Sequence, residues 1–258
     1  MDHSKSIEIV SHVWDAPGGE QYAQMARLQF ASLYSNRPSY PVTYSLCYEP
    51  SNGSVLQAIQ WIQAFFAREG TLHNLAVQTV AFPAEYLFRR AVGRNFCAKR
   101  TRADTVWFTD VDYYFGPGAI DAACELTTPD TQLVMPQQVQ IHQDHQTGDD
   151  DLAAQRNVAL PVIEREHFLP RRIRVAIGGL QIVGGNTARR LGYLDGTKWV
   201  QAVDPEQGFR SCACDRAFRR HNQFETQRLP IPEVYRLRHT QDGRDRDQRG
   251  TVRGKEVW

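Results

Sequence analysis

The feature that most constrains the fold is a regular alternation of strand-like and helix-like segments in the first half of the chain. Each β-rich run is followed by a segment whose apolar residues recur at helical spacing. Consecutive strand–helix–strand units place their strands parallel in one sheet and pack the helices on its faces. The first half therefore predicts an α/β fold with a mostly parallel sheet flanked by helices. In chain order the segments are strand 7–14, helix 21–34, strand 42–48, helix 55–66, strand 75–82, helix 84–102 and strand 105–109.

The second half of the chain is less regular. Apolar runs predict strands over 133–141 and 175–183, and the polar stretch 142–151 between them indicates an exposed loop. No linker, composition shift or internal repeat divides the sequence, and 258 residues can bury a sizeable core. We therefore expect a single domain over 1–258 that ends in a flexible tail, over about 241–258, rich in Arg, Asp and Gly.

Charge and apolar patterning exclude several classes of protein. The 30 Lys and Arg nearly balance the 29 Asp and Glu, for a formal net charge of +1, so no global field attracts nucleic acid or an anionic membrane. The longest apolar stretch, 175–183, is broken by two glycines and is far shorter than the roughly 18 residues of a membrane span. No apolar signal region precedes the first strand. These observations predict a soluble, cytoplasmic protein without a transmembrane segment.

The cysteines give no sign of a disulfide framework. Their number is odd and their spacing does not repeat, which predicts reduced thiols. The pair Cys212 and Cys214 is a poor zinc signal, because zinc sites usually space cysteines two to four residues apart and add a second pair. The cysteines are Cys47, Cys97, Cys124, Cys212 and Cys214.

The sharpest candidate site directly follows the strand 105–109, where one residue separates Asp110 from Asp112. Residues i and i+2 of an extended chain share a face, so the two carboxylates point together. Such a pair repels itself unless a cation lies between, and hard oxygen ligands suit Mg²⁺ or Mn²⁺, which also bind substrate phosphates. Open α/β sheets bind their ligands at the carboxyl ends of the strands. The alternative is a pair of turn or capping aspartates.

Four segments of the chain, in this order, resemble motifs of GT-A-fold glycosyltransferases. The helix from Arg89 to Ala98 leads into the strand that ends at Asp110-Val-Asp112, and the sequence Ala-Ile-Gly178-Gly179-Leu follows downstream. Cys-Asp215-Arg-Ala-Phe-Arg and Arg-Leu-Arg-His239 complete the set, which spans residues 7 to 239. The resemblance implies a GT-A-like fold with a nucleotide-binding half over about 1–115 and an acceptor and catalytic half over about 116–240.

The same resemblance implies a metal cofactor, Mn²⁺ or Mg²⁺, that bridges the phosphates of a nucleotide-sugar donor. Its ligands would be Asp110, Asp112 and His239, with Asp110 alternatively contacting the ribose. Without the family context, His239 is equally an ordinary core or surface histidine.

Three further residues are candidates for the nucleotide. Arg90 and Arg94 lie four apart on the predicted helix 84–102 and share a face, and a guanidinium presents a planar fork to phosphate oxygens. A solvated basic face is the alternative for both arginines. Glu49, after the second predicted strand, stands where the family has an acidic cluster.

The acceptor side rests on four residues. Gly178 and Gly179 interrupt an apolar strand, which marks either a close approach of backbone to the sugar or acceptor, or tight packing against a helix. Trp199, in a loop-like segment, offers a stacking face for the acceptor. Asp215 opens a predicted helix, 215–221, and is the candidate general base for in-line, inverting attack. Its alternative role is a helix cap worth about 1 kcal/mol.

Together these residues predict a metal-dependent hexosyltransferase that uses a nucleoside diphosphate sugar, UDP favoured, and a glycan or other hydroxyl acceptor. Two alternatives stay open: a noncatalytic nucleotide- or sugar-binding module, and a sugar-phosphate nucleotidyltransferase. The nucleotidyltransferase would need a Gly-rich phosphate loop followed by Lys near the N-terminus, whereas Pro17-Gly18-Gly19-Glu20 has no basic partner. A phosphatase of the haloacid dehalogenase type expects a small residue where Tyr114 stands.

Overall fold

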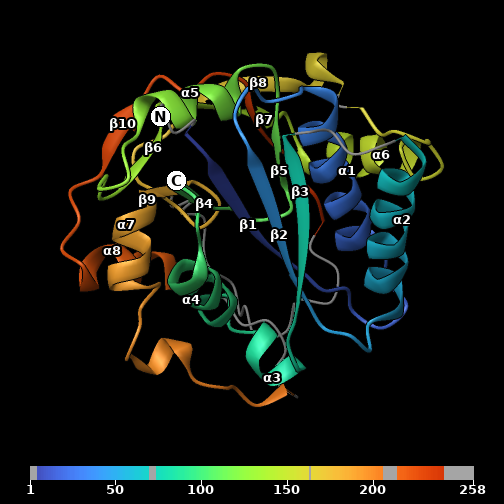
Figure 1. The fold of residues 1–258 in the computed structure, drawn as a ribbon. Helices are drawn as coiled ribbons and strands as arrows, with labels where there is room; N and C mark the ends of the chain where they lie inside the picture. Colours follow the sequence, from blue (N-terminus) through green and yellow to red (C-terminus); the bar gives the residue numbers. More distant parts are fainter. Residues whose placement is uncertain (1–4, 70–73, 163, 206–213, 241–258) are drawn as a thin grey trace, which may run out of the picture.

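A computed structural model describes residues 5–69, 74–162, 164–205 and 214–240. Within these residues, seven strands form one sheet in the order β10-β6-β9-β4-β1-β2-β3. The block β4-β1-β2-β3 is parallel, whereas β9 runs antiparallel to β4 and β6. The predicted α/β fold with a mostly parallel sheet flanked by helices is therefore confirmed (Figure 1). The strands are β1 (Ile7–Val13), β2 (Val42–Tyr48), β3 (Leu75–Ala81), β4 (Thr105–Phe108), β6 (Val134–Pro136), β9 (Gln181–Gly184) and β10 (Gln227–Leu229).

Helices cover both faces of this sheet. Figure 1 shows α1 and α2 side by side next to β1–β3, and α4 with α7 across the sheet from them. The first pair is joined by aromatic contacts, since the buried ring of Phe30 lies 5.9 Å from the rings of both Trp61 and Phe65. The helices are α1 (Gln21–Ser35), α2 (Gly53–Glu69), α3 (Ala84–Leu87), α4 (Arg90–Arg100), α5 (Ala119–Leu126), α6 (His145–Ala154), α7 (Gly185–Leu191) and α8 (Cys214–His221), with short 3-10 turns η1 (Arg165–His167) and η2 (Lys198–Val200).

A second sheet begins directly after Asp112. Among the described residues it has four strands in the order β5-β11-β7-β8. Arg236, the last residue of β11, pairs with Tyr113 of β5 on one side and with Ile141 of β7 on the other. This second sheet therefore continues from the carboxyl end of β4 and brings distant segments next to the Asp110–Asp112 turn. Its strands are β5 (Tyr113–Phe115), β7 (Gln138–His142), β8 (Phe168–Arg172) and β11 (Val234–Arg236).

Three predicted elements are divided in the structure. The expected strand 133–141 splits at Gln137 into β6 and β7, which belong to different sheets. Of the expected strand 175–183, only the part from Gln181 is a strand, because the residues before it form a turn in which Leu180 donates to the Ile177 carbonyl. The expected helix 84–102 breaks at Phe88, whose ring packs edge-on against Trp14.

The prediction of an exposed loop over 142–151 is wrong. Most of this stretch is α6, whose N-terminus is capped by the Asp144 carboxylate accepting from the Thr147 amide. The helix has no apolar stripe, and only Gly148 and Leu152 are buried. Packing against the rest of the fold stabilises it, and the sequence pattern does not show this contribution.

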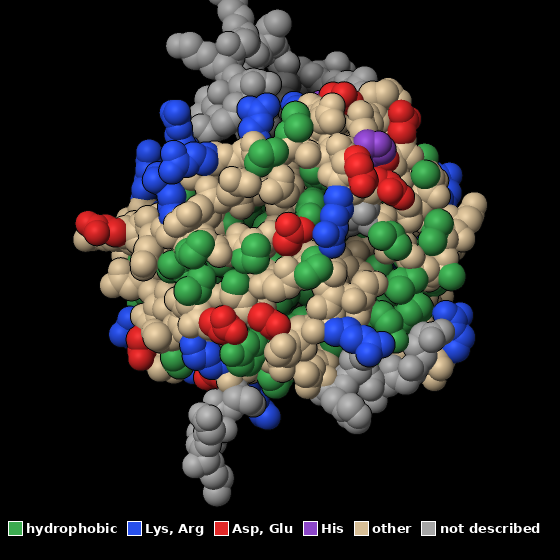
Figure 2. Space-filling model, turned by 90° about the horizontal axis from the view of Figure 1, so that it is seen from above, with side chains coloured by type: hydrophobic (Ala, Val, Ile, Leu, Met, Phe, Trp, Pro, Cys, Tyr) green, Lys and Arg blue, Asp and Glu red, His purple; other side chains and the backbone are tan. Residues whose placement is uncertain are grey.

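Four cysteines within the described part of the chain, Cys47, Cys97, Cys124 and Cys214, are buried free thiols. Cys212 and the predicted tail 241–258 lie outside the described residues. No helix in the described ranges is long and apolar enough to cross a membrane. On the face seen in Figure 2, basic and acidic side chains are interspersed, as the near-zero formal net charge leads one to expect.

Candidate functional site

Asp110, at the carboxyl end of β4, is held between two arginines of α4. Its Oδ1 lies 2.6 Å from Arg90 Nη1 and 2.9 Å from Arg94 Nη2. The two arginines are one helical turn apart, so the predicted shared face of this helix meets a single carboxylate. Arg94 is fully buried, whereas the Arg90 side chain is 21% exposed. Arg90 is therefore the arginine of this pair that a ligand can reach from solvent.

Arg94 of α4 forms hydrogen bonds with three other parts of the chain. Besides Asp110, its guanidinium donates to the Thr109 carbonyl at 3.1 Å, the Gly178 carbonyl at 2.7 Å and the Tyr193 hydroxyl at 3.0 Å. Burial lowers the pKa of Arg94, but the nearby Tyr193 and Asp110 outweigh this and raise it. The guanidinium is thus a permanent buried cation that positions the Asp110 carboxylate and the glycine turn.

The two glycines of this turn leave room for other groups. A Cβ at Gly178 would lie 3.1 Å from Asp110 Oδ2, and a Cβ at Gly179 would lie 2.1 Å from the ring of Tyr113. The Gly179 carbonyl also accepts from Trp107 Nε1 at 3.1 Å. Gly179 therefore permits tight packing against Tyr113, and a side chain at position 178 would crowd Asp110 Oδ2.

We expect Gly179→Ala to destabilise the protein by about 1–3 kcal/mol, the usual cost of overpacking a filled core. The added methyl group would overlap the Tyr113 ring, which is 1% exposed and cannot swing into solvent. Urea denaturation measures the change. Gly53→Ala is the matched control, because a Cβ there meets nothing within 4 Å and its effect should stay within about 0.5 kcal/mol. Equal stability of the two variants would show that the turn can relax.

The two carboxylate oxygens of Asp112 differ in their surroundings among the described residues. Oδ2 lies 3.3 Å from Arg236 Nε, and the Arg236 guanidinium is stacked 5.6 Å above the Tyr113 ring. Oδ1 is buried and has no hydrogen-bond partner among the described residues. The Asp112 carbonyl accepts from the Leu237 amide at 2.8 Å, which fixes the turn against β11. The site therefore presents a carboxylate oxygen that the described part of the chain does not satisfy.

This end of β4 fits a divalent cation on two observations. The buried Asp112 Oδ1 is a charged acceptor without a donor among the described residues, and leaving such a group unpaired is costly. Gly178 brings no side chain against Asp110 Oδ2, from which a Cβ would lie only 3.1 Å away. Oxygen atoms of this kind suit Mg²⁺ or Mn²⁺.

Asp215 joins the same site through its backbone. Its carbonyl accepts from Gln181 Nε2 at 3.0 Å, and Gln181 Oε1 in turn accepts from the Tyr193 hydroxyl at 2.6 Å. Tyr193 also accepts from Arg94, so a continuous hydrogen-bonded chain runs from Asp110 to the first turn of α8. The Asp215 backbone is thereby linked to the Asp110 carboxylate through the side chains of Gln181, Tyr193 and Arg94.

Glu49 and Trp199 lie outside this network. Glu49 Oε1 accepts from the Ser51 amide at 3.0 Å and from the Ser51 hydroxyl at 2.7 Å. Glu49 follows β2, and because β1 lies between β2 and β4, the two strands are roughly 10 Å apart. Trp199 belongs to η2, where the Arg89 guanidinium lies 5.9 Å from its ring. Trp199 thus packs beside the start of α4, because Arg89 immediately precedes Arg90, the first residue of that helix.

His239 lies in another neighbourhood. It is buried, its Nδ1 is 3.0 Å from the Thr240 carbonyl, and its ring meets Tyr22 edge-on at 5.3 Å. Tyr22 and Thr240 line a cavity of about 580 Å³ at the end of β1. Within the described residues, His239 does not appear with Asp110 and Asp112 in a group of close ligand atoms. Its role as a metal ligand stays a prediction.

Sequence reasoning missed a compact group formed by His142, Asp151 and His167, whose ligand atoms all lie within 4.8 Å of one another. Burial lowers the pKa of His142, whereas the hydrogen bond that His167 donates to the Asp151 carboxylate raises the pKa of His167. Neither histidine belongs to a spacing motif, so only the pairing of β7 with β8 reveals the group. Gln181, Tyr193 and Arg236 were likewise not predicted as site residues.

Comparison with known proteins supports the fold. No protein-family model matches the sequence, and no curated protein matches it. Among solved structures with a similar fold is the mannosyltransferase PcManGT from Pyrobaculum calidifontis in complex with GDP-Man and Mn²⁺, with a TM-score of 0.52 and 13% sequence identity. The match covers 92% of this chain and 58% of the mannosyltransferase chain, so this chain spans little more than half of the length of the mannosyltransferase. At this identity the likeness shows a shared fold alone.

Proposed function

We propose that the protein is a glycosyltransferase that uses a nucleotide-sugar donor. The observation that carries this proposal is the turn at the end of β4, where Asp110 is engaged by two arginines and Asp112 keeps a buried oxygen without a partner among the described residues. A glycosyltransferase of similar fold, which carries GDP-Man and Mn²⁺, supports it. We further propose a nucleotide-binding half over about 1–115 and an acceptor half over about 116–240.

The donor's diphosphate is the part of the substrate that this turn suits. Arg90 presents a planar fork at the solvent side of Asp110, and such a fork matches phosphate oxygens. Arg94 is buried and acts on Asp110 by holding its carboxylate in place. Asp110 and Asp112 would hold Mn²⁺ or Mg²⁺, which when bound supplies Lewis-acid stabilisation of the leaving diphosphate. Glu49 is proposed only as a more distant nucleotide contact.

On the acceptor side, we assign Asp215 as the general base. It lies in the first turn of α8, and the Gln181–Tyr193–Arg94 chain fixes its backbone relative to Asp110. A base in this place would take the proton of the attacking hydroxyl, opposite the leaving diphosphate, and the sugar would be inverted. Gly178 and Gly179 would border the bound sugar, and Trp199 would stack on the acceptor.

Thermal shift with UDP and GDP, each with Mn²⁺ or with EDTA, tests the proposal. A nucleotide at 100 times its dissociation constant adds about 2.7 kcal/mol of stability, which raises Tm by several degrees. We expect one of the two, UDP by the sequence prediction, to do so only with Mn²⁺. Mn²⁺-dependent release of the nucleotide from the matching nucleotide sugar would then separate an enzyme from a binding module. No shift with either nucleotide would contradict the proposal.

A further inference from the structure

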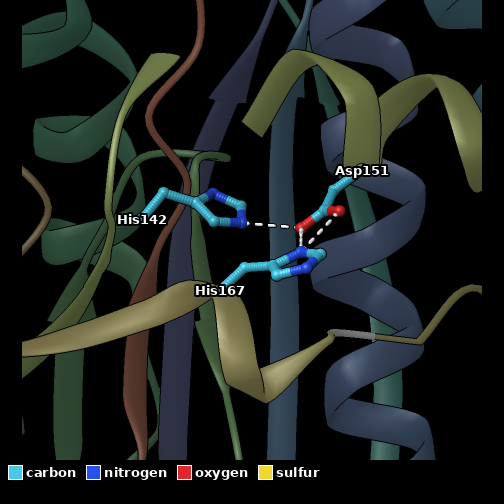
Figure 3. A group of neighbouring side chains, drawn as sticks. All are labelled: His142, Asp151 and His167. Atoms are coloured by element: carbon cyan, nitrogen blue, oxygen red, sulfur yellow. Dashed lines mark hydrogen bonds and ion pairs between the residues drawn. The ribbon is translucent and has the colours of Figure 1, made fainter. Parts of the chain in front are cut away.

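We propose that His142, Asp151 and His167 form a second metal site, which binds Zn²⁺ or a similar transition-metal ion and fastens α6 to the second sheet. The three side chains come from the end of β7, from α6 and from η1, and they converge on one point (Figure 3). This site is separate from the one proposed at Asp110 and Asp112, and its test needs neither nucleotide nor sugar.

The distances are close to those of a metal site. His142 Nε2 is 2.8 Å from Asp151 Oδ2, and His167 Nδ1 is 2.9 Å from both carboxylate oxygens. Ligand atoms 2.0–2.1 Å from a tetrahedral Zn²⁺ are about 3.3 Å apart, so each histidine nitrogen needs to move about 0.5 Å away from the Asp151 carboxylate. A cavity of about 10 Å³ borders His142 and Asp151.

The group is built to bring α6 onto the His142 ring. A Cβ at Gly148 would lie 1.8 Å from the Arg238 carbonyl oxygen and 3.0 Å from His142 Nδ1. Only glycine permits this approach, and Asp151 follows three residues later on the same side of α6. His142 Nδ1 faces Gly148 and is buried without a hydrogen-bond partner among the described residues, so Nε2 is the ring nitrogen that reaches Asp151.

The ligand types select the metal. Two imidazoles and one carboxylate suit Zn²⁺, Fe²⁺, Co²⁺ or Ni²⁺, whereas Mg²⁺ and Ca²⁺ prefer oxygen ligands alone. Asp144, Glu164 and Glu166 lie close enough to act electrostatically on the two histidines, which favours a cation there. The His167 side chain is 43% exposed, so an ion can enter from its side and keep a water as fourth ligand.

The site also has a structural consequence. α6 contacts α1, where Gln21 donates to Asp149, and the Asp149 carboxylate accepts from the amide and hydroxyl of Thr240. A metal at Asp151 would fix a helix that has little apolar surface of its own. We therefore expect the ion to stabilise this part of the fold.

Calorimetric titration of untagged, metal-free protein with ZnCl₂ tests the proposal, with CoCl₂ as a spectroscopic probe. We expect one equivalent of Zn²⁺ to bind at micromolar or lower concentration and to raise Tm by several degrees. Co²⁺ should give the visible absorption of a four- or five-coordinate ion, and added MgCl₂ should leave that absorption unchanged, because Mg²⁺ prefers oxygen ligands.

His167→Gln is the decisive variant, because its side chain is partly exposed and the fold should tolerate the change. We expect at least a tenfold loss of Zn²⁺ affinity and loss of the Co²⁺ absorption. His221→Gln, an exposed histidine on α8, is the matched control and should bind as the unmodified protein does. Asp112→Asn should also bind normally, which separates this site from the proposed catalytic one. Absence of stoichiometric binding, or equal binding by His167→Gln, would reduce the group to a hydrogen-bonded cluster.

Discussion

Asp112→Asn is expected to lower sugar-transfer turnover at least a hundredfold and to abolish metal-dependent binding of the nucleoside diphosphate. The substitution keeps the size of the side chain but removes the charge of the one carboxylate with a buried oxygen that lacks a partner among the described residues. Stabilisation of the leaving diphosphate by a bound cation is worth several kcal/mol, and each 1.36 kcal/mol is tenfold in rate.

The fold should survive this change. The Asp112 Oδ2 atom lies 3.3 Å from Arg236 Nε, and the oxygen of an asparagine side chain can still accept from that donor, so the contact with β11 is retained. Asp130→Asn, at an exposed aspartate that accepts from Asn186, is the isosteric control and should leave turnover unchanged. Calorimetry with UDP and GDP, with Mn²⁺ or with EDTA, measures the binding. Equally tight binding in EDTA would refute the metal assignment at Asp112.

Asp215→Asn is expected to keep donor affinity and to lower turnover at least a hundredfold, the scale of a lost general base. The alternative role predicted from the sequence for Asp215 is a helix cap. Because α8 begins at Cys214, Asp215 stands in its first turn, where a carboxylate interacts with the helix dipole and is worth about 0.3–1 kcal/mol of stability. The backbone bond from Gln181 to the Asp215 carbonyl is unaffected by the change, so the helix should stay in place.

Two measurements separate these roles for Asp215. Turnover of Asp215→Asn at saturating donor reports on proton transfer, while urea denaturation reports on the helix dipole. Asp215→Glu keeps the charge in the first turn and should retain stability, but its displaced carboxylate should still slow transfer. NMR of the product should show an anomeric configuration opposite to that of the donor. A retained configuration, or near-normal turnover of Asp215→Asn, would limit Asp215 to a structural role.

The sequence was informative where local pattern and burial agree. The strands β1 to β4 are short apolar or β-branched runs, each bounded by turn residues, and their alternation with helices permits little besides a parallel sheet. The position of Asp110 and Asp112 just beyond the carboxyl end of β4 follows from the same pattern. The shared face of Arg90 and Arg94 could also be predicted, because helical spacing alone sets it.

The sequence did not reveal which partners those residues meet. Arg94 was predicted as a phosphate contact or a solvated residue, yet it is fully buried, with partners at Asp110, Gly178 and Tyr193 that lie 16 to 99 residues away. Such contacts depend on how strands far apart in the chain pair. The spacing of residues along the sequence does not predict which distant strands pair.

By itself, then, the sequence determined the periodic elements and the residue types at the strand ends, because these depend on neighbours within a few residues. Only the tertiary structure decided the rest. Most of the polar stretch 142–151 belongs to α6, in which Gly148 and Leu152 are buried against other elements. His142 and His167 came together because β7 and β8 are antiparallel, with His142 opposite Phe168. The free energy of these arrangements comes from burial and from long-range hydrogen bonds, which exist only after the chain has folded.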